Sequence, residues 1–184
     1  MVDEINKAGG IKGQQLELIV YDTQGDATKA MQGVNKLIKD DKVVAIIGPS
    51  TTGDAMAIIP VVEKAGIPLI ACAAGNKITD PVKKFVFKTA QNDVLAVTKI
   101  YKYLQSKNMK NVALITVSDG FGASGREQLK LRAGEFGMTI VSDETYGPKD
   151  EFMTAQLTKI RGSKAQAIIC RGTNPGPAKV ARNV

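Results

Sequence analysis

The chain has 184 residues, of which 43% are hydrophobic and 5% aromatic, which suits one ordinary domain or two small ones with an aliphatic core. The formal net charge is +7, but the basic residues are scattered over the polar faces of expected helices, so no nucleic-acid partner is expected. The sequence contains no histidine, which excludes Ser-His-Asp and Cys-His catalysis as usually built and histidine metal ligation, and no apolar run approaches the roughly 18 residues of a membrane span.

The first half of the chain alternates helix and strand signals. Residues 1–8 predict the end of a helix that Gly9 and Gly10 stop, and the β-rich segment 16–21 predicts a strand. Asp26 is the expected N-cap of the next helix. The elements expected after it are a helix over 27–39, a buried strand over 43–47, a helix over 52–64, a buried strand over 67–72 and a short strand over 85–88.

The second half repeats this alternation after a link over 89–93, with Asp93 as the expected cap of a helix over 94–107. The elements expected next are a buried strand over 112–117, a loop and helix over 120–136, a strand over 138–142, a helix over 152–161, a strand over 165–170 and a helix over 175–183. The pattern predicts an α/β fold with two Rossmann-like lobes, each a doubly wound parallel sheet and each incomplete. Residues 1–90 are expected to form the first lobe and residues 91–184 the second.

The first lobe lacks an opening strand, although a doubly wound sheet normally begins with a strand that lies in its middle. Segments 16–21 and 43–47 would then flank an empty position, where orphan backbone groups are costly. Three arrangements would resolve this: direct pairing of the two segments, a strand from a second copy in a homodimer formed by strand exchange, or a poorly ordered first lobe. The three strands of the second lobe are expected to form a contiguous 2-1-3 sheet.

Cys72 and Cys170 each end an apolar strand run and form no CxxC pair, so two buried free thiols are expected rather than a zinc or redox motif. Neither a metal nor a cofactor is predicted. No signal peptide is recognised, so an exported protein would have lost its leader before the first residue of this sequence.

The segment Gly48-Pro-Ser-Thr-Thr-Gly53 follows a buried strand and opens a helix. Its spacing nearly matches a phosphate-binding loop, but Asp54 stands where a lysine would reach the phosphates, which argues against nucleotide hydrolysis. The hydroxyls of Ser50, Thr51 and Thr52 at a helix N-terminus suit a carboxylate or another small anion. The simpler interpretation is that they only cap the helix, and the two roles are compatible.

The segment Gly120–Gly125 is a G-x-G-x-x-G between a strand and a helix, with Asp143 or Glu144 about where the partner of a dinucleotide ribose would lie. Against a dinucleotide, Ser118-Asp119 displaces the tight turn and Phe121 places a bulky ring at the crossover. The other interpretations are a glycine loop needed only for its turn, and a ligand loop with Phe121 as an apolar or stacking wall.

Two further features lie at the ends of buried strands. Ala71-Cys-Ala-Ala-Gly-Asn76 consists mostly of small residues, which would let a ligand or a packed helix approach the backbone closely. Arg171 directly follows a buried strand, where its charge would either bind an anion in the cleft or extend to water. Both interpretations of Arg171 remain open at this point.

Together these residues resemble the type I periplasmic binding proteins, specifically the branched-chain amino-acid (Leu/Ile/Val) receptors of ABC transporters. The matching segments keep the family's order and are Glu4–Gly13, Tyr21–Asp26, Val44–Pro49, Gly66–Ile70 and Ser118–Gly125. The resemblance implies two lobes that close over an amino acid or another small carboxylate without catalysis. It also implies an ABC permease as partner and a periplasmic or extracellular location.

The resemblance implies ligand contacts from both lobes: Ser50, Thr51, Thr52, Ala73, Ala74 and Gly75 in the first, and Phe121 and Thr173 in the second. Gly75 stands where amino-acid receptors often carry a hydroxyl, so an aromatic or aliphatic acid is an alternative ligand. The family's opening strand and everything after the second lobe's third strand have no counterpart, which predicts a truncated chain with weak or absent binding.

Three other functions stay open beside this one. The first is a nucleotide-linked oxidoreductase that uses residues 120–125. The second is a sensor or structural module built on the same fold, and the third is an engineered or structural fragment with no ligand.

Overall fold

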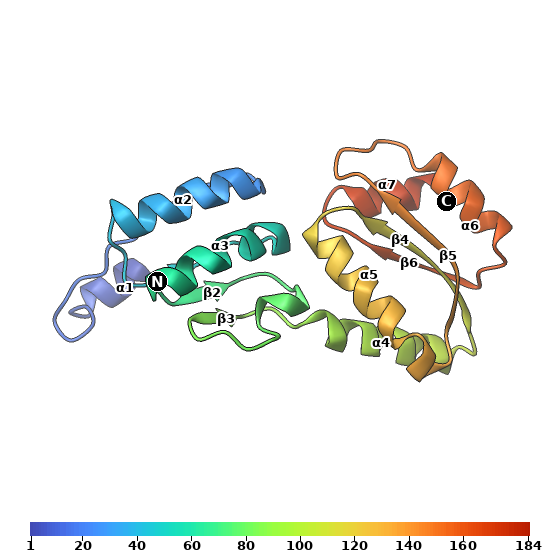
Figure 1. The fold of residues 1–184 in the computed structure, drawn as a ribbon, viewed down its shortest axis with the longest axis horizontal. Helices are drawn as coiled ribbons and strands as arrows, with labels where there is room; N and C mark the ends of the chain where they lie inside the picture. Colours follow the sequence, from blue (N-terminus) through green and yellow to red (C-terminus); the bar gives the residue numbers. More distant parts are fainter.

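The computed structural model describes residues 1–184 and places them in two lobes that lie end to end (Figure 1). Each lobe contains one three-stranded parallel sheet, with the strand orders β1-β2-β3 and β5-β4-β6. The first lobe contains α1 (Val2–Lys7), α2 (Ala27–Lys39), β1 (Ile46–Ile47), α3 (Thr52–Ala65), β2 (Leu69–Ala71), the 3-10 turn η1 (Asn76–Ile78) and β3 (Val86–Lys88). The predicted fold class, two incomplete parallel α/β lobes, is confirmed.

The second lobe is built around β4, its central strand. Its elements are α4 (Asp93–Ser106), β4 (Asn111–Val117), α5 (Gly120–Arg132), the 3-10 turn η2 (Gly134–Phe136), β5 (Thr139–Tyr146), α6 (Thr154–Gly162), β6 (Ala167–Arg171) and α7 (Gly176–Asn183). Val112 and Leu114 pack in a cluster with α4 and α5, whereas Ala113, Ile115 and Val117 pack in a cluster with α6 and α7. Because both faces of β4 are covered, its central residues 112–115 are all apolar. The predicted 2-1-3 order is confirmed.

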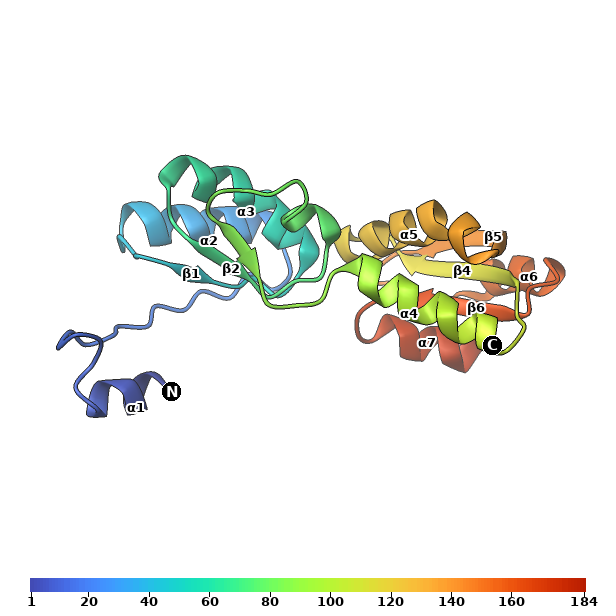
Figure 2. The ribbon, with the colours of Figure 1, turned by 90° about the horizontal axis from the view of Figure 1, so that it is seen from below.

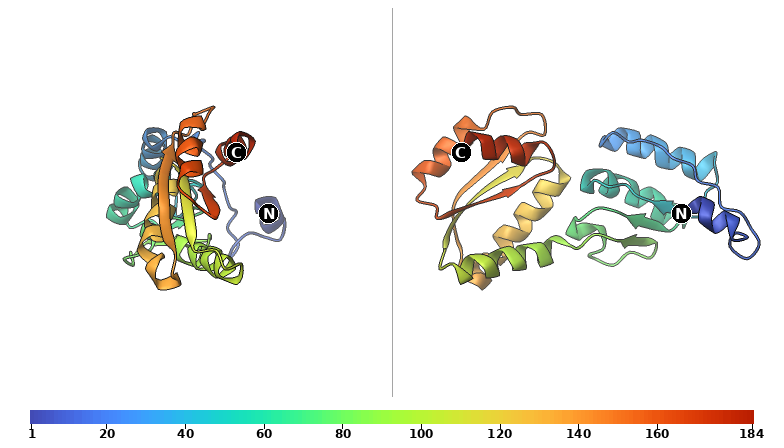
Figure 3. Two further views of the ribbon diagram at one scale, coloured as in Figure 1. Left: turned by 90° about the vertical axis from the view of Figure 1, so that its right-hand side faces the viewer. Right: turned by 180° about the vertical axis from the view of Figure 1, so that it is seen from behind.

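The first lobe is smaller and centres on α3 and β2. Its core cluster includes Ile58, Ile59 and Val62 from α3 and Leu69 from β2. The predicted strands over 43–47 and 67–72 shorten to β1 and β2, because only these residues pair across the sheet. The chain crosses to the second lobe once, through the segment that leads into α4 (Figure 3).

The helix starts mostly follow their local capping signals. The Asp26 carboxylate accepts a hydrogen bond from the Lys29 amide at 2.9 Å, which confirms the cap of α2. The expected cap of α4 is wrong, because Asn92 caps this helix by accepting from the Leu95 amide at 3.1 Å and Asp93 is its first residue. None of the helices combines the length and the apolarity that crossing a membrane requires.

The predicted strand over 16–21 does not form. The segment runs extended beside the first lobe, as Figure 2 shows, but residues 17–22 make no backbone–backbone hydrogen bond. Leu18 and Val20 are 66% and 75% exposed. An apolar groove of about 170 Å³ separates the segment from β1, so the direct pairing considered above is wrong. The β propensity of this segment stays unrealised because neither of its edges has a partner strand.

Neither cysteine is buried, so the expectation of two buried thiols is wrong. Both thiols are free, with Cys72 half-buried and Cys170 exposed. Cys170 lies in β6, which is an edge strand of its sheet and therefore not covered by a further strand.

Asp143 on β5 ties α5 to the sheet. It accepts from Arg126 Nε at 2.6 Å and from Lys130 Nζ at 2.9 Å. Burial alone raises the pKa of Asp143, but the hydrogen bonds and charges of Arg126 and Lys130 outweigh it and hold this pKa below its usual value. The carboxylate therefore stabilises the fold above the unfolded-state pKa, and this contribution is lost as the pH falls through the folded-state pKa.

We expect Asp143→Asn to lower the melting temperature of the second lobe by a few degrees near neutral pH. The difference from the parent chain should shrink as the pH falls through the lowered pKa of Asp143 and vanish once this carboxylate is protonated in the folded state. Circular dichroism melts at a series of pH values measure this, with Glu17→Gln, an exposed carboxylate without a hydrogen bond, as the matched control. A difference that persists in acid would contradict the electrostatic origin.

Candidate ligand-binding site

A cavity of about 350 Å³ lies where the two lobes meet. Residues from both lobes line it: Gly25, Ala27, Ser50, Thr51, Thr52, Gly53, Asp54, Cys72, Ala73, Ala74, Ala90, Asp119, Gly120, Phe121 and Thr173. Every residue predicted to bind the ligand is among them except Gly75. The sequence motifs of the two halves therefore meet in one cavity, at the carboxyl ends of the strands.

The three hydroxyl residues before α3 differ in what they contact. Thr51 Oγ1 accepts from the Asp54 amide at 3.2 Å and caps the helix. Thr52 Oγ1 accepts from the Gly75 amide at 3.2 Å and is buried. Ser50 is exposed and its hydroxyl has no hydrogen-bond partner within the protein. One hydroxyl thus caps the helix, one supports the neighbouring loop, and one is free for a ligand, beside the first N–H groups of the helix, which have no intrahelical acceptor.

The loop Ala73–Gly75 is fixed from two sides. A Cβ on Gly75 would collide with the Thr52 side chain, so the hydroxyl residue expected from the family's pattern has no room here. From the other side, Lys88 Nζ donates to the carbonyls of Ala74 and Gly75 at 3.0 and 3.2 Å. Burial lowers the pKa of Lys88. Lys88 was not predicted as part of the site, because no local motif in the sequence marks it.

The N-terminus of α5 forms the rim of the cavity that belongs to the second lobe, called the second rim below. Asp119 caps this helix by accepting from the Gly122 amide at 2.9 Å, and Phe121 follows on its first turn. A Cβ on Gly120 would lie 2.9 Å from the Cα and N atoms of Gly53 in α3. The N-termini of α3 and α5 therefore face each other across the gap between the lobes (Figure 1).

No lysine or arginine lines the cavity, and its carboxylates are Asp54 and Asp119. Asp54 is 1% exposed and accepts from Thr23 Oγ1 at 2.6 Å, so it holds the turn before α2 against α3. A bound carboxylate would have to rely on neutral donors and on the positive ends of the two helices. Such an arrangement can bind and orient a small anion.

The glycines of the segment Gly120–Gly125 let neighbouring backbone and side-chain atoms pack closely against it. A Cβ on Gly122 would collide with the Val117 carbonyl, and one on Gly125 would collide with the Arg171 side chain. Asp143, the candidate ribose partner, is already bound to Arg126 and Lys130. The whole segment lies in the first turns of α5, and these contacts favour glycines required for close packing over a dinucleotide-binding loop.

Two residues beside the cavity have roles that sequence analysis did not find. Arg171 neither enters the cavity nor extends to water, but pairs with the buried Asp93. The Tyr146 hydroxyl is buried against Gly172 and Gly176, at the base of the loop that carries Thr173. Burial raises the pKa of Tyr146 to about 12.

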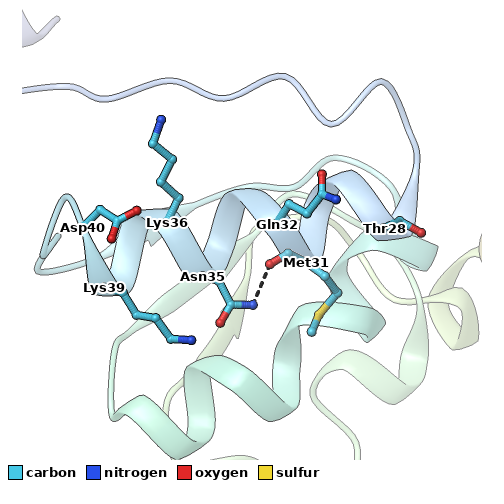
Figure 4. Close-up of a pocket in the computed structure, with 7 residues that line it drawn as sticks. All are labelled: Thr28, Met31, Gln32, Asn35, Lys36, Lys39 and Asp40. Carbon is cyan, nitrogen blue, oxygen red and sulfur yellow. Dashed lines mark hydrogen bonds between the residues drawn. The ribbon is translucent and has the colours of Figure 1, made fainter.

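A second hollow, of about 430 Å³, lies along α2 and differs in kind. Its lining residues come from this helix and its C-cap Asp40: Thr28, Met31, Gln32, Asn35, Lys36, Lys39 and Asp40. Figure 4 shows Lys36 and Lys39 extending away from each other. The hollow has no convergent set of polar groups, so it carries no candidate site.

Two parallel α/β lobes with a cavity between opposed helix N-termini define a two-lobed ligand-binding protein. The whole chain, residues 1–184, matches the family model described as periplasmic binding protein, and the chain belongs to this family. The resemblance seen in the sequence is thereby confirmed.

The relatives include amino-acid-binding proteins. The chain is 26% identical to the Leu/Ile/Val-binding protein BraC3 of Rhizobium johnstonii, over 100% of this chain and 50% of that protein. It is 28% identical to an amino acid binding protein of Pseudomonas aeruginosa, over 99% of this chain and 49% of the relative. The chain thus spans about half the length of the curated relatives it matches.

Solved structures share the fold. The branched-chain amino acid transporter substrate binding protein LivJ of Streptococcus pneumoniae, in complex with isoleucine, superposes with a TM-score of 0.85 at 31% identity, over 97% of this chain and 51% of that one. A type 1 periplasmic binding protein of Bordetella pertussis superposes with a TM-score of 0.91 at 26% identity, over 99% and 51% of the two chains.

Proposed function

We propose that this chain is the ligand-binding part of a solute-binding protein that serves an ABC-type uptake system for amino acids or other small carboxylates. The observation that carries the proposal is that residues from both lobes line one and the same cavity. Its volume of about 350 Å³ suits a small ligand. Family membership and the amino-acid receptors among the relatives support the same function.

In this proposal the ligand carboxylate lies at the N-terminus of α3, on the Ser50 hydroxyl and the free N–H groups that follow it. Ala73 and Ala74 allow the ligand to approach the backbone, and Phe121 covers its apolar part from the other lobe. Thr173 adds a hydroxyl at the rim. The chain binds and releases the ligand without transforming it.

The wider setting follows from the same family. We place the lobe boundary between residues 90 and 91, immediately before α4. A periplasmic or extracellular location and an ABC permease as partner fit a solute-binding protein.

The apolar groove between residues 18–21 and β1 supports a homodimer formed by strand exchange, because a strand there would meet two unpaired edges.

An amide-resolved NMR titration with L-leucine tests the proposal. We expect saturable shifts at Ser50–Gly53 and at Gly120–Phe121, with a dissociation constant on the order of millimolar because no lysine or arginine lines the cavity to pair with the ligand carboxylate. Ser50→Ala should weaken binding about threefold to tenfold through one lost hydrogen bond.

Ser106→Ala, which does not line the cavity, is the control. 4-Methylpentanoate is leucine without its amino group. Titration with it shows whether the site requires that group, and so distinguishes a receptor for acids from a receptor for amino acids. Shifts confined to residues 120–125 on addition of NADH, with none on addition of leucine or 4-methylpentanoate, would instead favour the oxidoreductase.

A further inference from the structure

A buried ion pair lies directly behind the second rim of the cavity. Arg171, the last residue of β6, pairs through its guanidinium with Asp93, the first residue of α4. The two side chains are 11% and 0% exposed. The pair joins the end of a strand to the start of the helix that follows the crossing between the lobes.

The same guanidinium covers the back of the aromatic wall. Its carbon lies 4.3 Å from the centroid of the Phe121 ring, a cation–π contact. Gly125 makes this path possible, because any side chain there would collide with Arg171. Arg171 Nε is buried without a hydrogen-bond partner, so the arginine is held by its stacking and by Asp93.

The second oxygen of Asp93 extends the network to the other lobe. Ser124 Oγ donates to Asp93 Oδ2 at 2.5 Å and accepts from the amide of Asn76, in η1 of the first lobe, at 3.2 Å. One turn further along α5, Glu127 pairs with Lys77 of η1 at 2.8 Å. The α5 helix therefore bears Phe121, contacts the Asp93–Arg171 pair and touches the first lobe.

We propose that Arg171 is a positioning residue for the ligand site. Together with Asp93 it fixes the Phe121 ring at the wall of the cavity, and through Ser124 the pair maintains the contact of α5 with η1. Arg171 does not touch the ligand, because its charge is neutralised by Asp93 outside the cavity. The effect on ligand affinity rests on the proposed function, whereas the effect on the Phe121 ring does not.

The chain contains no tryptophan, so Phe121→Trp creates a single fluorescent reporter at the wall. In this background Arg171→Leu should raise the acrylamide quenching constant about twofold and lower the steady-state anisotropy, because the ring loses its stacked partner. Arg171→Lys keeps the charge beside Asp93 but loses the planar stack. Its quenching constant and anisotropy should therefore lie between those of the Phe121→Trp parent and those of the Arg171→Leu variant. Arg161→Leu, an exposed arginine on α6, is the matched control and should change neither reading.

Arg171→Lys also covers the case in which Arg171→Leu does not fold, since it leaves Asp93 paired. Equal quenching and anisotropy in the parent and the folded Arg171 variants would overturn the proposal. With Phe121 intact, Arg171→Lys should weaken leucine binding about threefold or more in the NMR titration. If the reporter responds but the unsubstituted chain binds neither leucine nor 4-methylpentanoate, the positioning role stands and the proposed function fails.

Discussion

Asp93→Ala is expected to lower the free energy of unfolding by about 3–5 kcal/mol, which would make it one of the most damaging single substitutions in the chain. Asp93 is fully buried, and its removal leaves the Arg171 guanidinium without a counter-charge in a site from which water is largely excluded. The Ser124 hydroxyl loses its acceptor at the same time. Urea denaturation followed by circular dichroism measures the loss.

A double variant separates the cost of an unpaired charge from the value of the pair. Asp93→Ala combined with Arg171→Met removes both charges and keeps much of the arginine's apolar volume, so it should cost clearly less than the two single changes added together. Glu17→Ala, at an exposed carboxylate without a partner, should be within about 0.5 kcal/mol of the parent. Strict additivity of the Asp93 and Arg171 changes would contradict the pairing.

The second large effect concerns the two separate cores. Leu69→Ala in the first lobe and Leu114→Ala in the second should each cost about 2–5 kcal/mol, because both side chains are fully buried. Leu69 packs in a cluster made only of first-lobe residues, and Leu114 in one made only of second-lobe residues. Each change should therefore destabilise its own lobe.

Hydrogen exchange resolved by residue distinguishes the lobes. Leu69→Ala should speed exchange in α3 and β2, and Leu114→Ala in β4 and its neighbours. Leu18→Ala, at a side chain that is 66% exposed, serves as the matched leucine control and should change little. Equal loss of protection in both lobes for each variant would show a single cooperative unit and contradict the proposed boundary.

Much of the fold could be predicted because the hydrophobic period and the caps agree locally. The bounds of α2 follow from Asp26 and the apolar spacing after it, and the strand order of the second lobe follows from its apolar runs. The segment 16–21 shows the limit of this reasoning, because a strand exists only with a partner and the period of one segment says nothing about a partner. The ion pair of Asp93 shows the same limit of local reasoning, because its partner Arg171 lies 78 positions away in the sequence.

The rims of the site could be predicted for a topological reason. Loops after parallel strands gather at one edge of a sheet, so Ser50 and Ala73 could be expected to lie near each other in the first lobe and Phe121 at the corresponding edge of the second. That the two edges face each other is implied only by the resemblance to the family. Lys88 and Tyr146 could not, because each supports a loop through tertiary contacts that no spacing in the sequence encodes.

The most direct test of the central claim is a filtered NOE experiment with ¹³C-labelled L-leucine and the 184-residue chain. A ligand held between the lobes predicts contacts from the leucine methyl protons to the Phe121 ring and, in the same complex, from leucine to the methyl groups of Ala73 and Ala74. Contacts with one lobe only, or with residues outside this cavity, would contradict a site shared by the two lobes.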